Sequence, residues 1–404
     1  MYRVKYLPKM IIIVIVAVSL LLSVSCWDSR EIDDLALILG IAVDYIPEEE
    51  KVMYSTLVVR PGQVGGVQEG SGQFFMGPVW ISESSGKTLF EASRNLSSRS
   101  PRFIFESHIQ AIVVGEEIAR RGIAEVVDYV TREREQRLLP PFLIAKGRAV
   151  EVFRAEPELE NNIAQEIRGI LNSQLDLSTT PVINVKNFIL PLNQPGIDAV
   201  APVIQVSEVP TFPDEELPVG YEPESKKTIS IEGTAVFSRN QLAGFLDVPE
   251  TKGMLWVRGD VTQTTMIPRL PDEGEVTVYI IRSGSSMEPE FIDNKLKISI
   301  QIETEGDIFI STIRQDISDP EVIEELEKTL ANHIKQEILA AAAKSKEYQS
   351  DFLGFGAAFR RKDPEKWKEF EKSWREMLQE VEVEVRVLAE IRRTGLISTP
   401  ILVE

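Results

Sequence analysis

The stretch "KLKISIQIETEGDIF" (residues 295–309) alternates apolar and polar residues, most regularly from Leu296 to Ile302. Successive side chains of a strand point to opposite faces, so Leu296, Ile298, Ile300 and Ile302 would share one face of a sheet. A strand with one apolar and one polar face is typical of an antiparallel sheet that is covered on one side. The stretch therefore predicts an α+β fold rather than a doubly wound parallel sheet.

The segments around this stretch support the same fold. Two of them also alternate, "EVTVYIIRS" (275–283) and "VEVEVRVLAEIRRTG" (381–395). Between them, residues 320–348 predict a long helix with one apolar stripe, formed by Ile323, Leu326, Leu330, Ile334 and Ile338. A second helix is predicted over 363–378, with Asp363 as its cap and Pro364 at its first position. We expect a C-terminal antiparallel sheet packed with long helices over residues 228–404, with a subdivision near residue 285 as an alternative.

The first half of the chain mixes strands and helices in an irregular order. "DLALILGIAVDY" (34–45) predicts a strand buried on both faces, with "KVMYSTLVVR" (51–60) as its hairpin partner. "RFIFESHIQAIVVG" (102–115) predicts one strand, and a helical pattern follows over 116–133. Successive mixed α/β domains are therefore expected, the first of them over residues 26–206.

A change of composition separates the two halves. Residues 207–227, "SEVPTFPDEELPVGYEPESKK", hold four prolines and eight charged residues. Proline removes backbone donors and charge resists burial, so this composition is typical of an exposed segment. The sequence predicts an exposed linker over 207–227.

The N-terminus has the order of a secretory signal peptide over residues 1–25: a basic start, an apolar run that begins at Met10, and small residues. The apolar run is shorter than the roughly 20 residues that a membrane span needs. Cys26 follows directly and is the only cysteine of the chain. This is the bacterial lipoprotein arrangement, in which the thiol is lipidated and the signal peptide is removed. Ser23 stands where that pattern usually has leucine, and an uncleaved anchor with an incidental cysteine is the alternative.

Composition limits the classes of function. The chain has a formal net charge of −19, and without residues 1–25, which hold three basic and no acidic residues, the charge is −22. A nucleic-acid partner is not expected, because phosphate binding needs a basic surface. His108 and His333 lie far apart in the sequence, and no HExxH, paired-cysteine or GxSxG motif occurs. We expect no metal, no cofactor and no catalytic residue, so the protein is not expected to be an enzyme.

The order of five segments resembles, over almost the whole chain, the Ger(x)C family, the lipoprotein C subunits of nutrient germinant receptors in bacterial endospores. The resemblance is carried by "CWDSREIDDLALILGIAVD" (26–44), "SHIQAIVVGEEIARRGI" (107–123) with "REREQR" (132–137), "GTAVFSRNQLAGFLDVPETKGMLW" (233–256), "DFLGFG" (351–356), and "WKEFEKSWREM" (367–377) with "VEVEVRVLAEIRRTG" (381–395).

This resemblance implies a non-enzymatic, lipid-anchored subunit of a membrane nutrient receptor that triggers spore germination. It implies the integral membrane A and B subunits as partners, and an acyl anchor such as palmitate on Cys26. It also implies a location on the outer face of the spore inner membrane, and a fold of successive mixed α/β domains. Two alternatives stay open: a solute-binding lipoprotein of a transporter, and an envelope scaffold without a signalling role.

The short tether adds one expectation about contacts. Five residues separate Cys26 from Ile32, the first apolar residue expected of the first strand. Fully extended they reach about 17 Å, so the first domain should lie close to the membrane. Because the chain is acidic, an anionic lipid surface is expected to repel it, and a protein partner to hold it. We expect Asp28, Arg30 and Glu31 at or beside that partner contact; capping of the first strand by these charges is the alternative.

Overall fold

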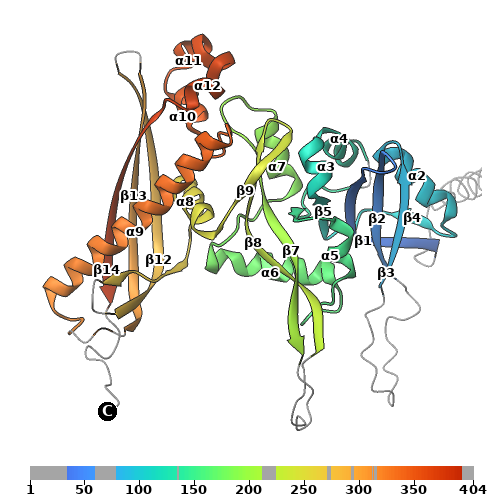
Figure 1. The fold of residues 1–404 in the computed structure, drawn as a ribbon, viewed down its shortest axis with the longest axis horizontal. Coiled ribbons are helices and arrows are strands. Elements are labelled where there is room, and N and C mark those ends of the chain that lie inside the picture. The colour runs from blue at the N-terminus through green and yellow to red at the C-terminus, as the bar shows by residue number, and fades with distance from the viewer. Residues whose placement is uncertain are drawn as a thin grey trace, which may run out of the picture.

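The computed structural model describes residues 34–59, 79–133, 136–211, 224–270, 274–292, 295–311, 313 and 316–393. Strand β1 (Leu35–Ile46) lies inside the first sheet (Figure 1). It pairs antiparallel with β2 (Lys51–Val59) and parallel with β5 (Ala111–Gly115). The predicted buried strand and its hairpin partner are thereby confirmed.

The first sheet has nine strands in the order β3, β2, β1, β5, β6, β7, β8 and β9, with β4 beside β1. Strands β1, β5, β6 and β7 run parallel, and antiparallel strands flank them on both sides. The other strands of this sheet are β3 (Val79–Gly86), β4 (Phe103–Phe105), β6 (Phe142–Ala145), β7 (Val200–Thr211), β8 (Glu224–Ser238) and β9 (Gln241–Leu246).

Helices cover both faces of this sheet. Ile112 and Val114 of β5 pack on one face, and Ala111 and Val113 pack on the other. A strand that is apolar throughout fits between two such layers, because neither of its faces meets water. One layer holds α2 (Leu89–Arg99), α3 (Glu116–Arg121), α4 (Ala124–Arg132) and α7 (Val185–Leu192); the other holds α5 (Ala149–Arg154) and α6 (Ile163–Leu177).

The prediction of a single strand over 102–115 is wrong. The chain forms two strands, β4 and β5, which both pair with β1 but are separated at Glu106. The Glu106 carboxylate is buried and accepts hydrogen bonds from the hydroxyls of Tyr54, at 2.6 Å, and Tyr129, at 3.1 Å. The buried acid, which lies in the segment 106–110 that separates the two strands, therefore has hydrogen-bond partners.

The expected linker is part of the first sheet at both of its ends. Residues 207–211 and 224–227 pair antiparallel as the ends of β7 and β8, from Ser207 opposite Thr228 to Thr211 opposite Glu224. Strand β8 then continues along the first sheet and β9 pairs with it, so residues 228–246 belong to that sheet. Residues 212–223 lie outside the described part of the chain.

The second sheet is formed mainly by a long hairpin of β12 (Gly274–Ile292) and β13 (Lys295–Ser311). Ile298, Ile300 and Ile302 are buried, as the alternation predicted. This part of the sheet is antiparallel, but β14 (Glu382–Arg393) pairs parallel to β13, because the chain crosses over through a helix before it returns. Short strands β10 (Thr264–Met266) and β11 (Arg269–Leu270) pair with β12. The fold is α+β, as expected.

Helices α8 (Val248–Arg258) and α9 (Pro320–Glu347) pack on the second sheet (Figure 1). The predicted stripe of α9 is buried at Leu326, Leu330, Ile334 and Ile338, whereas Ile323 is only half-buried. Helix α8 also contacts β8, so it joins the two sheets.

The predicted helix over 363–378 is interrupted. Helix α11 (Pro364–Phe370) and helix α12 (Trp374–Leu378) are separated by a 3₁₀ turn. Asp363 caps α11 as expected, since its carboxylate accepts the Lys366 N–H at 3.0 Å. The preceding segment, expected as a loop, contains helix α10 (Phe355–Lys362).

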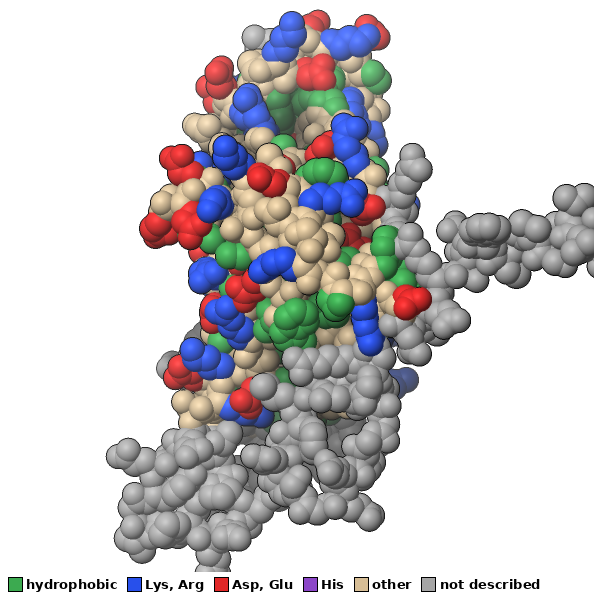
Figure 2. Space-filling model, turned by 90° about the vertical axis from the view of Figure 1, so that its right-hand side faces the viewer, with side chains coloured by type: hydrophobic (Ala, Val, Ile, Leu, Met, Phe, Trp, Pro, Cys, Tyr) green, Lys and Arg blue, Asp and Glu red, His purple; other side chains and the backbone are tan. Residues whose placement is uncertain are grey.

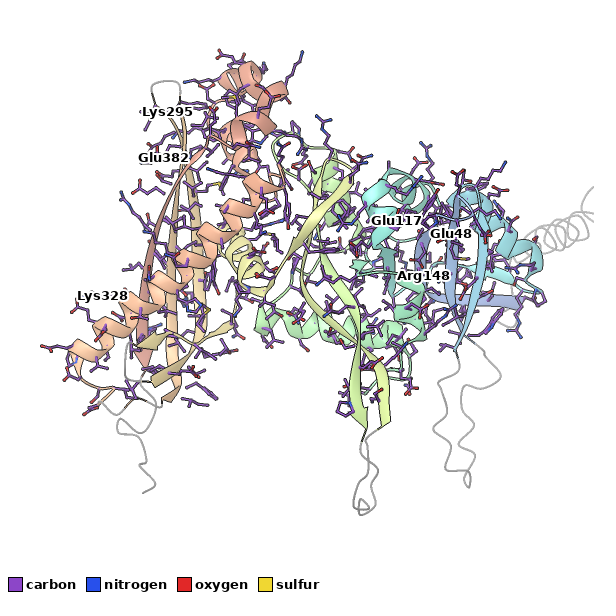
Figure 3. All side chains as sticks on the ribbon, viewed as in Figure 1. Glu48, Glu117, Arg148, Lys295, Lys328 and Glu382 are labelled. Atoms are coloured by element: carbon purple, nitrogen blue, oxygen red, sulfur yellow. The ribbon has the colours of Figure 1, made fainter. Side chains whose placement is uncertain are left out.

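Charged side chains lie over the surface of the molecule (Figure 2 and Figure 3). Figure 2 looks onto the end of the molecule that carries α2, where Lys and Arg side chains lie among hydrophobic ones. Figure 3 places Lys295 and Glu382 on the second sheet and Lys328 on α9, at the opposite side of the molecule from Glu48.

Candidate functional site

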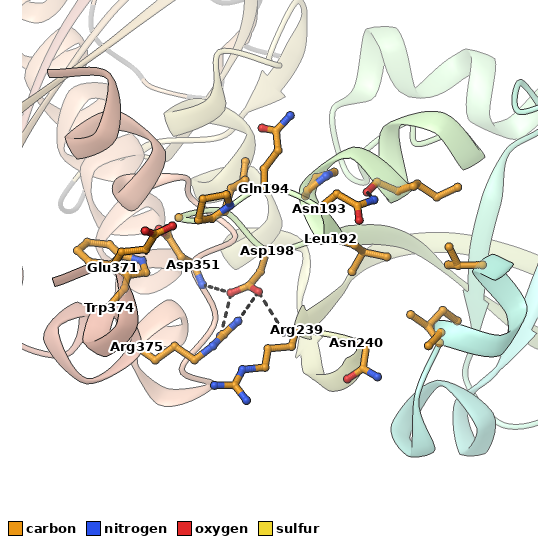
Figure 4. A pocket seen from close by; sticks show the side chains of 18 of the residues that line it. Leu192, Asn193, Gln194, Asp198, Arg239, Asn240, Asp351, Glu371, Trp374 and Arg375 are labelled. Atoms are coloured by element: carbon orange, nitrogen blue, oxygen red, sulfur yellow. Dashed lines mark hydrogen bonds and ion pairs between the residues drawn. The ribbon is translucent and has the colours of Figure 1, made fainter. Parts of the chain in front are cut away.

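The carboxylate of Asp198 lies where the two halves of the chain meet (Figure 4). It accepts two hydrogen bonds from the Arg375 guanidinium, Nη2 to Oδ1 at 2.7 Å and Nη1 to Oδ2 at 3.0 Å. It also accepts the backbone N–H groups of Arg239, at 3.0 Å, and Asp351, at 2.8 Å. Asp198 precedes β7, Arg239 lies in the β8–β9 turn and Arg375 is on α12, so one buried side chain connects the first sheet to the C-terminal helices. We call this place the junction.

Asp351 is the second carboxylate of the junction. Its Oδ1 accepts the N–H groups of Gly354 and Phe355 at 2.8 Å, and its Oδ2 accepts the N–H of Gly356 at 2.7 Å. The Trp374 indole donates to the same Oδ2 at 2.9 Å. Burial raises the pKa of Asp351 to about 7, although these hydrogen bonds oppose the rise. The carboxylate therefore fixes the start of α10 by satisfying the free N–H groups of its first turn.

The "DFLGFG" segment is closely packed. Gly354 has a φ of +80°, which favours glycine. A Cβ on Gly356 would lie 2.6 Å from the Cα of Gly196 and 2.7 Å from the ring of Trp367, so that position has no room for a side chain. Around these glycines, a cluster of buried aromatic rings is formed by Phe352, Phe355, Phe359, Trp367 and Trp374. The aromatic residues of this motif fill a local core.

A groove with polar and apolar lining residues runs along the junction. Its volume is about 670 Å³, and both halves of the chain line it. The lining includes charges of both signs and amide side chains: Asp128, Asn193, Gln194, Arg239, Asn240, Glu371 and Lys372. Figure 4 shows that Arg239 is joined to Asp198 through its backbone N–H and not through its guanidinium. The groove can therefore offer hydrogen-bond donors and acceptors to a polar segment.

Other buried carboxylates lie apart from the junction. Glu337 of α9 accepts the Trp256 indole N–H at 2.9 Å, and burial raises its pKa to about 7. Burial also raises the pKa of Glu106 and of Asp44, whose carboxylate accepts the N–H groups of Ala149 and Val150 at the start of α5. Each of these acids has hydrogen-bond partners within the fold. In the described part of the chain, no group of three or more His, Cys, Asp or Glu is arranged to hold a metal ion.

The site residues predicted from sequence lie outside the described residues. This applies to Cys26 with the signal peptide over residues 1–25, and to Asp28, Arg30 and Glu31. No helix within the described ranges is long and apolar enough to cross a membrane.

Sequence reasoning missed the junction. Asp198 stands alone in the apolar segment "GIDAVAPVIQV" (196–206), and a lone acid between apolar residues was the only available signal. Its partner Arg375 lies 177 positions later. Their pairing follows from the fold, which brings the quoted segments 233–256, 351–356 and 367–377 together.

Two family models match the chain. "Spore germination protein N-terminal domain" matches residues 28–206, and "Spore germination B3/GerAC like, C-terminal" matches residues 232–395. The junction is formed by residues from both matched ranges, since Asp198 belongs to the first range and Arg375 to the second.

Several curated proteins are similar to the chain along nearly their whole length. Spore germination protein KC of Bacillus subtilis (strain 168) is 26% identical over 406 residues, covering 97% of this chain and 98% of that protein. Spore germination protein B3 of the same organism is 23% identical over 392 residues, covering 92% and 95%. The crystal structure of the GerBC protein matches the fold with a TM-score of 0.54 and 18% identity, covering 87% of this chain and 96% of that one.

Proposed function

Because the chain belongs to the Ger(x)C family of spore germination proteins, we propose that it is a non-enzymatic, lipid-anchored subunit of a membrane nutrient receptor that triggers germination. It acts through contacts with the integral membrane A and B subunits of that receptor. The diacylglyceryl group on Cys26 holds it on the outer face of the spore inner membrane, after removal of residues 1–25.

The observation that carries this proposal is that two germination family models match the two halves of one chain in order, over 28–206 and 232–395. The groove at the junction supports a role in binding a protein partner. It is lined by both halves and presents charges of both signs, so a polar loop of another subunit can form ion pairs and hydrogen bonds there.

Crosslinking in intact spores tests the proposal. A photoreactive amino acid is placed at Asn240, in the groove, at Arg30, near the anchor, and at Lys328, on the far end of α9 as a control. We expect the first two positions to crosslink to integral membrane subunits and Lys328 not to do so. Attachment of only a transporter permease, or of peptidoglycan enzymes, would instead support the transporter or scaffold alternatives.

A further inference from the structure

We propose that the end of the molecule formed by α2 and the start of β4 docks on an anionic phospholipid surface. This end, called the α2 surface, consists of Lys87, Phe90, Arg94, Arg99, Arg102 and Phe103. The inference deepens the proposed function and rests on it for the membrane that carries the anchor.

The α2 surface concentrates positive charge in an acidic protein. Lys87, Arg94, Arg99 and Arg102 are all exposed, and among the described residues none of them forms an ion pair. The Arg99 guanidinium donates instead to a backbone carbonyl. The one acid of α2, Glu91, accepts the Lys87 backbone N–H at 2.8 Å. Helix α4 adds acids beside α2: Glu125 accepts the Leu89 N–H at 2.6 Å, and Asp128, which is paired with Arg132, and Glu133 line a hollow with Phe90. The four cations of the α2 surface therefore carry positive charge without an ion-pair partner in the described part of the chain, whose formal net charge as a whole is −19.

Large apolar side chains lie between these cations. Phe90 is 55% exposed, Phe103 41% and Trp80, on the neighbouring strand β3, 49%. The Arg94 guanidinium sits over the Phe90 ring, 5.1 Å from its centre. Aromatic side chains flanked by arginine and lysine suit the region between lipid headgroups and acyl chains, where the ring is buried and the cation meets phosphate. Figure 2 shows this mixture of basic and hydrophobic side chains at this end.

The chain enters the fold at the same end. Leu35 is paired with Phe103, and Ala36 with Ile104, so the first residues of β1 lie next to the α2 surface. Eight residues separate Cys26 from Leu35. Even fully extended, they span about 30 Å, which keeps this end near the bilayer when Cys26 is lipidated.

This proposal differs from the expectation that an anionic membrane repels the first domain. That expectation used the net charge of the whole chain, but screening limits electrostatic attraction to charges within roughly 10 Å of the lipid. Each basic residue close to an anionic surface strengthens binding by roughly fivefold. With the α2 surface facing the lipid, its cations are near the bilayer and the second sheet is farthest away (Figure 3).

A single introduced thiol tests the orientation. Cys26 is the only cysteine, so in the lipidated full chain Ser98→Cys, on the exposed side of α2, provides a unique attachment point for a fluorophore. Lys328→Cys on α9 serves as the distant control. The chain is reconstituted into phosphatidylcholine vesicles with or without phosphatidylglycerol, and quenching by nitroxide-labelled headgroups is measured. We expect quenching at position 98 only in anionic vesicles, and none at position 328.

Charge reversal identifies the cause. Arg94→Glu, Arg99→Glu and Arg102→Glu together should reduce the ratio of docked to undocked protein by at least about 100-fold, because three attractions are lost and three repulsions are added. The matched triple variant Arg361→Glu, Lys362→Glu and Lys368→Glu, on α10 and α11, should leave it unchanged. Equal urea midpoints for parent and variants show that folding is intact.

The inference is overturned if position 98 is no more quenched than position 328, or if quenching is the same in neutral vesicles. It is also overturned if quenching requires the integral membrane subunits, because the α2 surface would then bind protein. Flotation with neutral vesicles measures separately whether the lipid on Cys26 attaches the chain to the membrane. A chain that lacks the lipid contradicts the proposed function alone, and its α2 surface should still bring it to anionic but not to neutral vesicles.

Discussion

At the scale of single residues, the Asp198–Arg375 pair is a charged connection between the halves. The side chain of Asp198 is 8% exposed and that of Arg375 27%. We predict that Asp198→Asn lowers the free energy of unfolding by about 3 kcal/mol, because it leaves a partly buried guanidinium without its counter-charge. Urea unfolding measures this loss. Asp128→Asn, in an exposed pair with Arg132, is the control and should cost about 0.5 kcal/mol or less; equal losses would contradict the argument.

Glu337 makes stability depend on pH. Its pKa is about 7 in the folded protein, mainly through burial between α8 and α9, and about 4.5 when exposed. The folded state thus binds a proton that the unfolded state has lost, and stability falls as pH rises from about 4.5 to 7. Lys252 and the Trp256 indole face the carboxylate and oppose this effect, and His333 lies 3.7 Å away.

We predict that Glu337→Gln removes this part of the slope. At pH 8 the variant should be more stable than the parent by up to about 3 kcal/mol, since the amide oxygen can still accept the Trp256 N–H. Asp351 titrates in the same range, so the informative quantity is the difference between variant and parent across pH. The control Glu324→Gln, exposed on the same helix, should leave the change of stability between pH 5 and 8 as it is in the parent. A Glu337→Gln variant that is less stable than the parent at pH 8 would disprove the prediction.

At the scale of elements, α8 and α9 are held by a close backbone contact at Gly253. A Cβ at this position would overlap the carbonyl of Glu337 and approach the Cβ of Ala341 to 3.0 Å. We predict that Gly253→Ala destabilises the fold by about 2 kcal/mol, because the helices must move apart. Gly169→Ala, on the exposed side of α6 where the new Cβ meets only one atom at 4.0 Å, should instead stabilise by about 0.5 kcal/mol. Thermal or urea unfolding distinguishes the two signs.

The elements also show which sequence signals were sufficient. Alternation predicted β12, β13 and β14, because a face that meets water must be polar. Alternation does not encode direction, so the parallel pairing of β14 could not be read from it. Helix α5 has only six residues, four of them buried, and fewer than two turns are too short to show a helical period. The junction was not predictable either, since the Asp198–Arg375 pair exists only after both halves have folded.

At the scale of the whole molecule, the halves are not separated by the predicted linker. We predict that a chain cut at a protease site inserted between residues 216 and 217 stays together on gel filtration, because the paired ends of β7 and β8 and the strand β9 keep the second fragment in the first sheet. Separation of the two fragments without denaturant would show that these strands contribute little. The control for complete cleavage is the same cut protein after unfolding in urea, in which the two fragments should separate.

The tether gives a prediction about signalling. Inserting about twenty Gly and Ser residues after Trp27, with lipidation intact, would let the first domain move roughly 25 Å farther from the bilayer. We predict loss of the germination response to each nutrient at a normal protein level, because contacts with the membrane subunits become rare. The control is an insertion of the same Gly and Ser residues between residues 216 and 217. An unchanged germination response in the tether variant would mean that distance from the membrane is unimportant.

The parallel pairing of β14 with β13 also sets an order of assembly. The first sheet has all its strands once residue 246 has emerged, so it can form during synthesis or export. The second sheet cannot, because β13 has an open edge until α9 and then β14 have followed. Until β14 pairs with β13, the hairpin of β12 and β13 exposes a strand edge and apolar isoleucine side chains, and such a hairpin is prone to associate with other chains. From the late return of the chain we therefore expect the C-terminal half to complete its sheet after the first sheet, and to be the part more sensitive to aggregation while the protein is produced.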